Sequence, residues 1–353
     1  MYSASILKIS NKVPPVTKPL ILSVLDQSPI RSGATAADAV NETIALAQAT
    51  ERLGYQRYWL AEHHNTEGLA GCAPEIMITR VAAATSSIRV GSGGVMINHY
   101  SPYKLAEMFR LLEVMFPGRI DLGLGRAPGS DPRTAQALAY GSNIGVDYIP
   151  TKLHDLVAFL TDTDPSNDGF RTVHATPRPE GVPDLWMLGS SNGGGAFAAH
   201  FGFGFSFADF FGAMDGTEVM ASYFRDYQPS DLCPEPRGNV CVFVLCADTH
   251  ARAEKLAKSR DLWRLKIDKG DIGPYPSLKE AEAYEYQPYE QDQVDAHRRS
   301  AIIGTPGEVK QEIEAVAARY GVNDIAIVTI CHDPQARIHS YELVAEAFEL
   351  TPL

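Results

Sequence analysis

The feature that most constrains this chain is the regular alternation of short apolar strands with amphipathic helices along almost its whole length. Eight strand–helix units follow one another, and their predicted strands are residues 20–25, 57–61, 88–93, 120–124, 185–189, 203–208, 240–247 and 325–330. Parallel strands joined by helices leave no exposed strand edge when their sheet closes on itself. The pattern therefore predicts an α/β fold, the (β/α)8 TIM barrel, with an open doubly wound sheet as the alternative.

The last of these units carries the clearest helix signals. The motif TPGE at 305–308 is typical of a capping box with proline at the first helical position. Apolar residues then recur at helical spacing as far as Tyr320, and Gly321 follows as a helix stop. We expect residues 20–353 to form a single barrel domain, preceded by an N-terminal extension at 1–19.

Residues 269–300 interrupt the alternation. This segment lies between the seventh and eighth predicted strands, is polar and shows no convincing helical or strand period. It carries four tyrosines, namely Tyr275, Tyr284, Tyr286 and Tyr289. We predict an insertion in the barrel that acts either as a mobile lid or as a surface for a partner.

The charge balance disfavours two classes of partner. The chain has 31 Lys and Arg against 43 Asp and Glu, a net charge of −12, which argues against nucleic acid and anionic membranes. No apolar run is long enough to cross a bilayer, and the first segment lacks the apolar core of a signal peptide. The five cysteines are odd in number and scattered, as is typical of reduced thiols. Together these features predict a cytoplasmic protein.

Polar residues and glycines gather where the predicted strands end. In a (β/α)8 barrel the functional residues lie at the carboxyl ends of the strands. The residues at or just after these ends are Asp26, Gln27 and Ser28, Glu62, His63 and His64, Gly93 and Gly94, Gly125 and Arg126, Ser190, Ser191 and Asn192, and His332 and Asp333. We therefore expect the functional site on this face of the barrel.

The stretch GRIDLGLGRAPGSDPR at 118–133 is the most distinctive of these strand ends. Its glycines let the backbone approach a flat or anionic group closely, and Arg126 adds a positive charge beside them. Gly123, Gly125 and Gly129 nearly match a dinucleotide fingerprint. However, the third glycine is one position late, and the motif does not open the first strand–helix unit. A plain glycine-lined turn is the alternative.

Two further motifs have both a chemical and a structural interpretation. Glu62-His63-His64 contains metal-ligand residue types, but adjacent histidines do not easily share one ion and no third ligand is evident, so we predict no metal site. One histidine is then a core residue, and the other is free for chemistry. The segment LGSSNGGGAF at 188–197 places hydroxyl and backbone N–H groups at a helix start, which indicates either a phosphate cradle or a plain helix cap.

Five segments, in order and spacing, resemble the bacterial luciferase-like family of flavin-dependent monooxygenases, and most closely its single-chain uncharacterised oxidoreductase branch. They are RYWLAEHHNTEG at 57–68, RVGSGGVMINHYSP at 89–102, FPGRIDLGLGRAPGSD at 116–131, WMLGSSN at 186–192 and IIGTPGEVKQEIEAVAARYGVNDIAIVTI at 302–330. The resemblance covers the chain from about Leu20 onward. It implies a (β/α)8 barrel with an insertion after the seventh strand, which agrees with the position of 269–300.

The resemblance also implies roles for individual residues. It makes His63 the catalytic-site histidine, places a cis peptide bond between Gly93 and Gly94 beneath the flavin ring, and assigns Arg126 to the flavin phosphate. Gly125 stands where the luciferases proper carry a reactive cysteine, so no thiol chemistry is expected there. The other residues that we assign to the cofactor site, including the two serines of the phosphate-binding turn, are Asp26, Gly125, Gly189, Ser190, Ser191 and Gly194.

The chain departs from the family pattern at three places. The glycines at 193–195 replace bulkier residues, which predicts a looser phosphate cradle. The segment INHYSP at 97–102 stands where the branch more often has LPNHSP, and FADFF at 207–211 lacks the Ser-His that relatives often place before the last Phe. We expect the substrate side of the site to differ accordingly.

The function implied by the resemblance is that of a two-component flavin monooxygenase. Reduced FMN from a separate flavin reductase would react with O2 and oxidise a small apolar organic molecule, with His63 handling the proton. No second nucleotide cradle is evident for NADH or NADPH. The alternatives are hydride transfer from a reduced deazaflavin coenzyme, a flavin-binding protein without turnover, and a metal-dependent hydrolase.

The resemblance further implies a homodimer. Its interface would include the helix that begins at Pro74. The face of this helix that is apolar enough to be buried consists of Ala73, Ile76, Met77, Arg80 and Val81.

Overall fold

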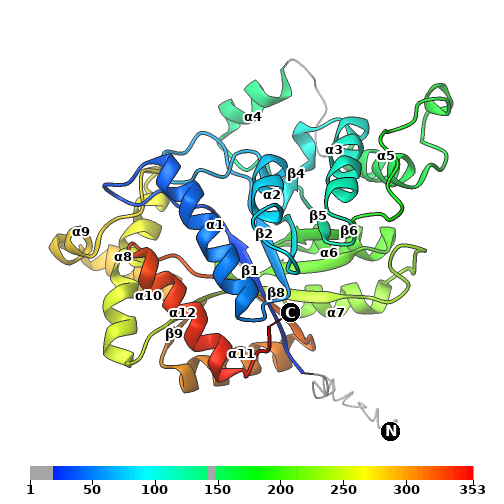
Figure 1. The fold of residues 1–353 in the computed structure, drawn as a ribbon. Coiled ribbons are helices and arrows are strands. Elements are labelled where there is room, and N and C mark those ends of the chain that lie inside the picture. The colour runs from blue at the N-terminus through cyan, green and yellow to red at the C-terminus, as the bar shows by residue number, and fades with distance from the viewer. Residues whose placement is uncertain (1–18, 141–147, 213, 353) are drawn as a thin grey trace, which may run out of the picture.

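The computed structural model describes residues 19–140, 148–212 and 214–352. Its centre is a ring of parallel strands, which helices surround (Figure 1). The ring strands are β1 (Ile21–Asp26), β2 (Arg57–Leu60), β3 (Arg89–Ser92), β5 (Ile120–Gly125), β6 (Asp184–Gly189), β7 (Gly204–Ala208), β8 (Gly238–Cys246) and β10 (Asp324–Val328). Apart from Pro19, the predicted extension at 1–19 lies outside the described residues.

The ring closes between β8 and β10. The strand order is β10-β1-β2-β3-β5-β6-β7-β8, and β8 pairs in parallel with β10 from Asn239–Asp324 to Phe243–Val328. The predicted closed (β/α)8 barrel is confirmed, and the open doubly wound sheet is excluded. Two short strands that the sequence pattern did not predict, β4 (Val95–Met96) and β9 (Ala301–Gly304), pair with β5 and β8.

Several helices begin at side-chain caps that the sequence contains, among them α11 (Pro306–Tyr320). Thr305 and Glu308 form the predicted capping box of α11, and Gly321 ends this helix with a φ of +66°. In the three ranges that the structure covers, no helix is both long and apolar enough to cross a membrane. The helices around the barrel are α1 (Ala36–Arg52), α2 (Pro74–Ala82), α3 (Pro102–Met115), α4 (Pro132–Ala139), α5 (Ile149–Thr161), α6 (Asn192–Phe201), α7 (Thr217–Asp226), α8 (His250–Asp268), α11 (Pro306–Tyr320) and α12 (Pro334–Ala347).

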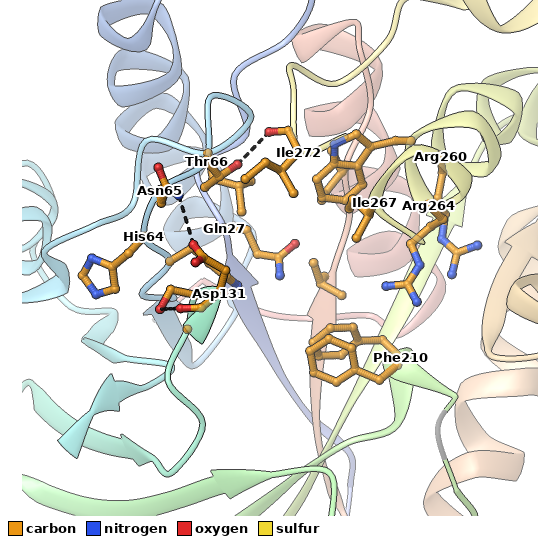
Figure 2. A pocket seen from close by; sticks show the side chains of 18 of the residues that line it. Gln27, His64, Asn65, Thr66, Asp131, Phe210, Arg260, Arg264, Ile267 and Ile272 are labelled. Atoms are coloured by element: carbon orange, nitrogen blue, oxygen red, sulfur yellow. Dashed lines mark hydrogen bonds between the residues drawn. The ribbon is translucent and has the colours of Figure 1, made fainter. Parts of the chain in front are cut away.

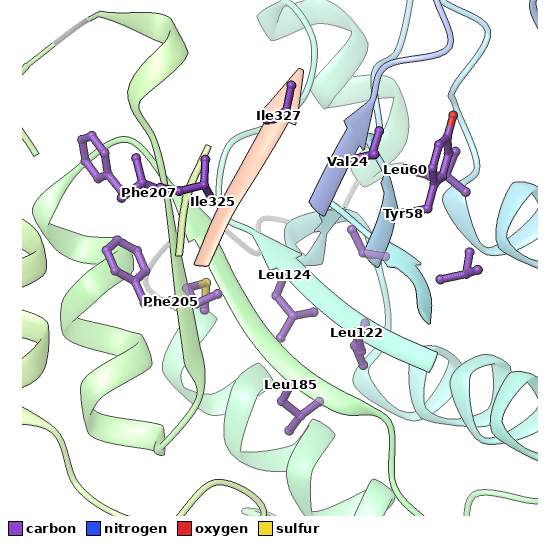
Figure 3. Close-up of a cluster of buried hydrophobic side chains, with 14 of the residues drawn as sticks. Val24, Tyr58, Leu60, Leu122, Leu124, Leu185, Phe205, Phe207, Ile325 and Ile327 are labelled. Carbon is purple, nitrogen blue, oxygen red and sulfur yellow. The ribbon is translucent and has the colours of Figure 1, made fainter. Parts of the chain in front are cut away.

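Side chains of the ring strands alternate between two buried apolar layers. Val24 and Leu60 belong to the outer layer (Figure 3). This layer also includes helical side chains such as that of Phe109. Trp59, one position before Leu60, belongs to the inner layer, where its ring lies 5.2 Å from that of Trp186. Because both layers are filled, the barrel interior is a packed core.

Ion pairs occupy the amino-terminal end of the barrel. Arg57 and Arg89, each the first residue of its strand, bind Asp324 and Asp121 respectively, both at 2.6 Å. The indole N–H of Trp59 donates to Asp121 at 2.8 Å. Because this end is filled and paired, ligands have access to the barrel from its carboxyl end.

The insertion between β8 and β10 contains more regular structure than its sequence indicates. Residues 269–300 form α9 (Leu278–Ala283) and α10 (Pro288–Arg298). Both helices are too short and too polar to show a clear period. They depend on capping boxes at Ser277 and Gln287, and on ion pairs such as that between Arg298 and Asp261. The segment therefore contains helices although its apolar residues show no helical periodicity.

Candidate active site

Two adjoining cavities open at the carboxyl ends of the barrel strands. The larger has a volume of about 430 Å³ and the smaller a volume of about 190 Å³. Both are lined by Gln27, His63, Phe210 and Phe211. The predicted site residues that line the smaller cavity are His63, Gly93, Gly94, Gly125, Arg126, Gly189, Ser190 and Ser191. The fold thus brings together most of the residues that we assigned to a cofactor.

Part of the wall of the smaller cavity is bare backbone. The peptide bond between Gly93 and Gly94 is cis, as the resemblance implies. A Cβ atom at Gly93 would lie 2.5 Å from Leu25 Cδ1, and one at Gly94 would lie 2.7 Å from the carbonyl oxygen of Gly123. Side chains are therefore excluded at both positions, and a flat ring can approach the backbone directly.

Arg126 supplies the positive charge of the smaller cavity. Its Nη2 donates to Ser191 Oγ at 2.8 Å, and its guanidinium lies 5.5 Å from the ring centre of Phe197. Burial lowers its pKa, and no carboxylate within the covered ranges forms an ion pair with it. Ser191 is the N-cap residue of α6, yet its side chain does not cap the helix. The guanidinium and the start of α6 therefore offer donors to an anion in one place.

The glycines that open α6 have close neighbours. A Cβ atom at Gly193 would lie 2.5 Å from Arg126 Nη1, and one at Gly195 would lie 3.1 Å from Val219. The space of the missing side chains is therefore filled by Arg126 on one side and by apolar packing on the other. A looser hold on a phosphate stays a prediction, because these contacts concern neighbouring side chains and not a bound anion.

His63 lies where the two cavities meet. Its Nδ1 is buried and has no hydrogen-bond partner in the part of the chain that the structure describes. Its backbone N–H donates to the carbonyl oxygen of Gly71 at 2.8 Å, which holds the residue in place. Burial, and to a lesser degree the neighbouring His64, lowers the pKa of His63 to about 4. The ring is therefore neutral at pH 7 and keeps one nitrogen available.

His64 is tied to its own loop instead. Its Nε2 lies 2.7 Å from Glu62 Oε1, and Glu62 Oε2 accepts a hydrogen bond from the backbone N–H of Met96 at 2.9 Å. His64 is thus paired, whereas the Nδ1 of His63 has no partner within the described residues, and both histidines line the larger cavity. Across the described ranges, no group of three His, Cys, Asp or Glu side chains is arranged to hold a metal ion.

Asp26 and Gly194, which we assigned to the cofactor site, line neither cavity. Asp26 is fully buried, and its carboxylate accepts hydrogen bonds from Arg337 of α12 at 2.7 Å and from the Tyr58 hydroxyl at 2.6 Å. Gly194 packs behind the turn, where an added Cβ atom would lie 3.3 Å from Phe205. Side chains alternate along β1, so its last residue points toward the helices. The geometry does not support a contact between Asp26 and a cofactor.

The larger cavity is lined mainly by residues that the strand ends did not indicate. α8 contributes Arg260, Trp263, Arg264 and Ile267. Their spacing of three and four residues places them on one helical face, and this is the signal that could have identified them. Figure 2 shows Arg260, Arg264 and Ile267 on the opposite side of the cavity from Asp131. Aromatic and aliphatic side chains make most of this cavity apolar.

Residues 270–275 of the insertion form part of the wall of the larger cavity. The carbonyl oxygen of Ile272 accepts a hydrogen bond from Thr66 Oγ1 at 2.9 Å (Figure 2). The backbone N–H of Ser32 donates to Tyr275 O at 2.7 Å, and the Tyr275 hydroxyl donates to Ile330 O at 3.0 Å. This part of the insertion is therefore bonded to the loops of the barrel mouth and belongs to the cavity.

The sequence matches a known family over most of its length. The family model for luciferase-like monooxygenases matches residues 20–324. The protein YwcH of Bacillus subtilis (strain 168) is 43% identical, over 93% of this chain and 98% of its own. The N-acetyl-S-alkylcysteine monooxygenase of the same strain is 36% identical, over 92% and 97%. The luciferase-like monooxygenase of Escherichia coli (strain K12) is 35% identical, over 94% and 98%.

Solved structures share the fold. Apo-MsnO8 has a TM-score of 0.84 and 36% identity, and the match covers 95% of this chain and 99% of that one. The oxygenating constituent of 3,6-diketocamphane monooxygenase from Pseudomonas putida, in complex with FMN, has a TM-score of 0.68 at 19% identity, over 94% and 98%. An F420-dependent secondary alcohol dehydrogenase has a TM-score of 0.64 at 15% identity, over 94% and 99%. These last two show the fold alone. The family model and the relatives above 30% identity show that this chain belongs to the luciferase-like monooxygenase family.

Proposed function

We propose that this protein uses reduced FMN and O2 to oxidise a small organic molecule. The observation that carries the proposal is the arrangement of the two cavities, which have a cation at Arg126, bare backbone at Gly93 and Gly94, and neutral His63 between them. When bound, reduced FMN supplies the two electrons that let one atom of O2 enter the substrate while the other leaves as water. The named monooxygenases among the relatives, at 35% and 36% identity, support oxygen chemistry.

The chain can hold the phosphate of FMN near Arg126. The donors available there are the guanidinium, the hydroxyls of Ser190 and Ser191, and the first N–H groups of α6. Hydrogen bonds from a cation to a phosphate are among the strongest in proteins, and a helix N-terminus adds to them. The wall at Gly93 and Gly94 then admits a ring without obstruction by a side chain.

His63 is placed to accept or donate a proton beside the reacting atoms. Its neutral ring has a free Nδ1, and the residue lines both the cofactor cavity and the larger cavity. Phe210 and Phe211 line both cavities as well, so apolar rings border the junction. The larger cavity is therefore the place for the organic substrate.

Anaerobic titration with reduced FMN, followed by admission of O2, tests this function. We expect reduced FMN to bind more tightly than oxidised FMN, and the oxidation of bound flavin to be coupled to oxygenation of an added substrate. The reduced deazaflavin coenzyme is the parallel titration. A preference for it would replace oxygen chemistry with hydride transfer, and binding of neither coenzyme would contradict the proposal.

We also propose that a separate reductase supplies the reduced flavin. The chain has no dinucleotide fingerprint in its first strand–helix unit, and the near match at 123–129 belongs to the turn that carries Arg126. Mixing the protein with FMN and NADH or NADPH without oxygen should leave the flavin absorbance unchanged. Rapid bleaching without an added reductase would show that the protein reduces its own flavin.

The third proposal is a homodimer formed through α2 and α3. Ile76 is 67% exposed, and Leu111 and Met115 from α3 lie in the same apolar groove. Met77 and Val81, which the sequence placed on this face, are buried in the core of the chain itself, so the predicted face was wrong at these two positions. We expect a dimer in sedimentation and a monomer for Ile76→Asp. A monomeric wild-type protein would contradict the proposal.

A further inference from the structure

Two arginines enter the larger cavity from one face of α8. Arg260 and Arg264 are one helical turn apart, and Figure 2 shows their side chains extending from α8 toward Phe210. Arg260 is 3% exposed. Its Nη1 and the Nε of Arg264 are buried and have no hydrogen-bond partner in the ranges that the structure covers. Two cations therefore face a mostly apolar cavity.

The nearby carboxylates of the described residues form no ion pair with these cations and bind other groups, although the charges of Asp261 and Asp268 act to raise the pKa of Arg260 and of Arg264 respectively. Asp261 accepts hydrogen bonds from Arg298 at 3.0 Å and 2.6 Å, and Asp268 lies 3.0 Å from His297 Nε2. Across the cavity, Asp131 caps α4 and accepts from Asn65 at 3.0 Å. The pairs found within the described ranges include none between either arginine and a carboxylate.

The remaining contacts of Arg260 are weak. Its guanidinium carbon lies 4.3 Å from the ring centre of Phe243, and its Nη2 reaches the carbonyl oxygen of His297 at 3.4 Å. Burial, followed by repulsion from Arg264, lowers the pKa of Arg260 to about 10, so it stays charged at neutral pH. Burying such a charge costs free energy unless an opposite charge pairs with it.

We propose that the larger cavity binds an organic carboxylate with an apolar tail, held by Arg260 and Arg264. This inference rests on the proposed function, because it defines the substrate class of that site. The guanidinium groups match a carboxylate in geometry as well as in charge. The apolar tail lies among the aromatic residues that lead to His63, where the oxidation takes place. A neutral apolar substrate, as the sequence suggested, would leave the buried Arg260 and the half-buried Arg264 without an anionic partner.

Calorimetric titration without flavin tests the proposal independently of the oxygen chemistry. The probes are octanoate, 4-phenylbutanoate and N-acetyl-S-butylcysteine, each with its uncharged amide. We expect at least one acid to bind about ten-fold or more tightly than its amide, and Arg264→Gln to abolish this preference. Arg252→Gln removes the same charge from an exposed position on α8 and serves as the matched control. Equal binding of all acids and amides, or no binding of any acid, would overturn the proposal.

Inorganic phosphate is a further arm of the same titration. If it binds wild-type protein as tightly as the acids and loses its affinity in Arg264→Gln, the cavity is a phosphate site and the proposal is wrong. Reduced FMN should bind the Arg264→Gln variant as it binds wild type. A failure of FMN binding in both proteins, with the carboxylate preference intact, would contradict the proposed function and leave this inference standing.

Thermal unfolding gives a readout that needs no ligand of known identity. Arg260→Met keeps the apolar stem and removes the buried charge, so the ligand-free variant should have a Tm equal to or above that of wild type. An acid that binds should raise the Tm of wild type but not that of Arg260→Met. A clearly lower Tm together with unchanged carboxylate binding in Arg260→Met would make this arginine structural and overturn the proposal.

Discussion

The two cavities that meet at His63 are built from different parts of the chain. The smaller owes its character to backbone, namely glycines at strand ends and the first turn of α6, with Arg126 as its cation. The larger is walled by side chains of α8, of the insertion and of Phe210. A backbone site depends on local turns, whereas a side-chain site depends on which helix packs beside which strand. The first kind leaves a motif in the sequence, and the second leaves only a helical spacing.

Removing the imidazole at the junction should have the largest effect. We expect His63→Ala to lower turnover by about 10²–10⁴-fold with reduced-FMN affinity retained, because the proton donor or acceptor is lost while the charge of the cofactor cavity is not. Steady-state kinetics and anaerobic titration measure the two quantities. Partial recovery of turnover with added imidazole is the control. If the variant instead loses flavin binding and imidazole restores no turnover, His63 is a packing residue with no part in the chemistry.

The charge at the far end of the smaller cavity should have the next largest effect. Arg126→Ala should weaken FMN by about 10–100-fold and leave riboflavin, which has no phosphate, nearly unaffected. Binding of carboxylates in the larger cavity should not change. Arg252→Ala is the matched control, since it removes an exposed arginine that lines neither cavity. Equal losses for FMN and riboflavin would mean that Arg126 supports the fold rather than the phosphate.

The smallest expected effect is on stability at acid pH. His63 has a pKa of about 4 in the folded protein, below its ordinary value of 6.5, so the unfolded chain binds its proton more readily. Its contribution to stability is therefore full above about pH 6.5 and is lost as the pH falls toward 4. Between about pH 7 and pH 4.5 we therefore expect the Tm of His63→Gln to fall less than the Tm of wild type.

A histidine with the opposite shift provides the control for this measurement. Hydrogen bonds to Glu342 and Asp248 raise the pKa of His339, so its protonated form stabilises the folded protein at low pH. On acidification the Tm of His339→Gln should therefore fall more than the Tm of wild type. If wild type and His63→Gln lose the same Tm, the His63 ring is solvated and does not lie in a dry junction.

The sequence predicted the elements whose signals are local. The eight ring strands are apolar runs bounded by turn residues, and α11 begins and ends at its predicted caps, Thr305 and Gly321. β4 was missed because two residues are too few to show a period. β9, which is as long as β2 and β3, was missed because it lies outside the eight-strand ring that the alternation predicts. α9 and α10 were missed because caps and ion pairs stabilise them more than an apolar face does.

The candidate site divides in the same way. Arg126 and the glycines at 93–94 were found because a strand-to-helix turn that approaches a ligand needs these residue types in sequence. Asp26 was assigned by the same rule, but the alternation of side chains along β1 turns it toward Arg337. Arg260 and Arg264 were not found because a helical arginine is most often exposed, and nothing local shows that α8 turns this face inward.

By itself the sequence determined a closed parallel barrel and the face of it that carries the site, since apolar periods, caps and glycine turns act over a few residues. Only the tertiary structure decided which of two adjacent histidines is paired, and which arginines have no carboxylate as an ion-pair partner. His64 pairs with Glu62, two residues away, but Glu62 is itself held by the backbone of Met96. The charged pairs join segments that lie far apart in the chain, such as Asp26 with Arg337 or Asp261 with Arg298. Burial and pairing set the charge of a side chain, and both arise only when distant segments pack together.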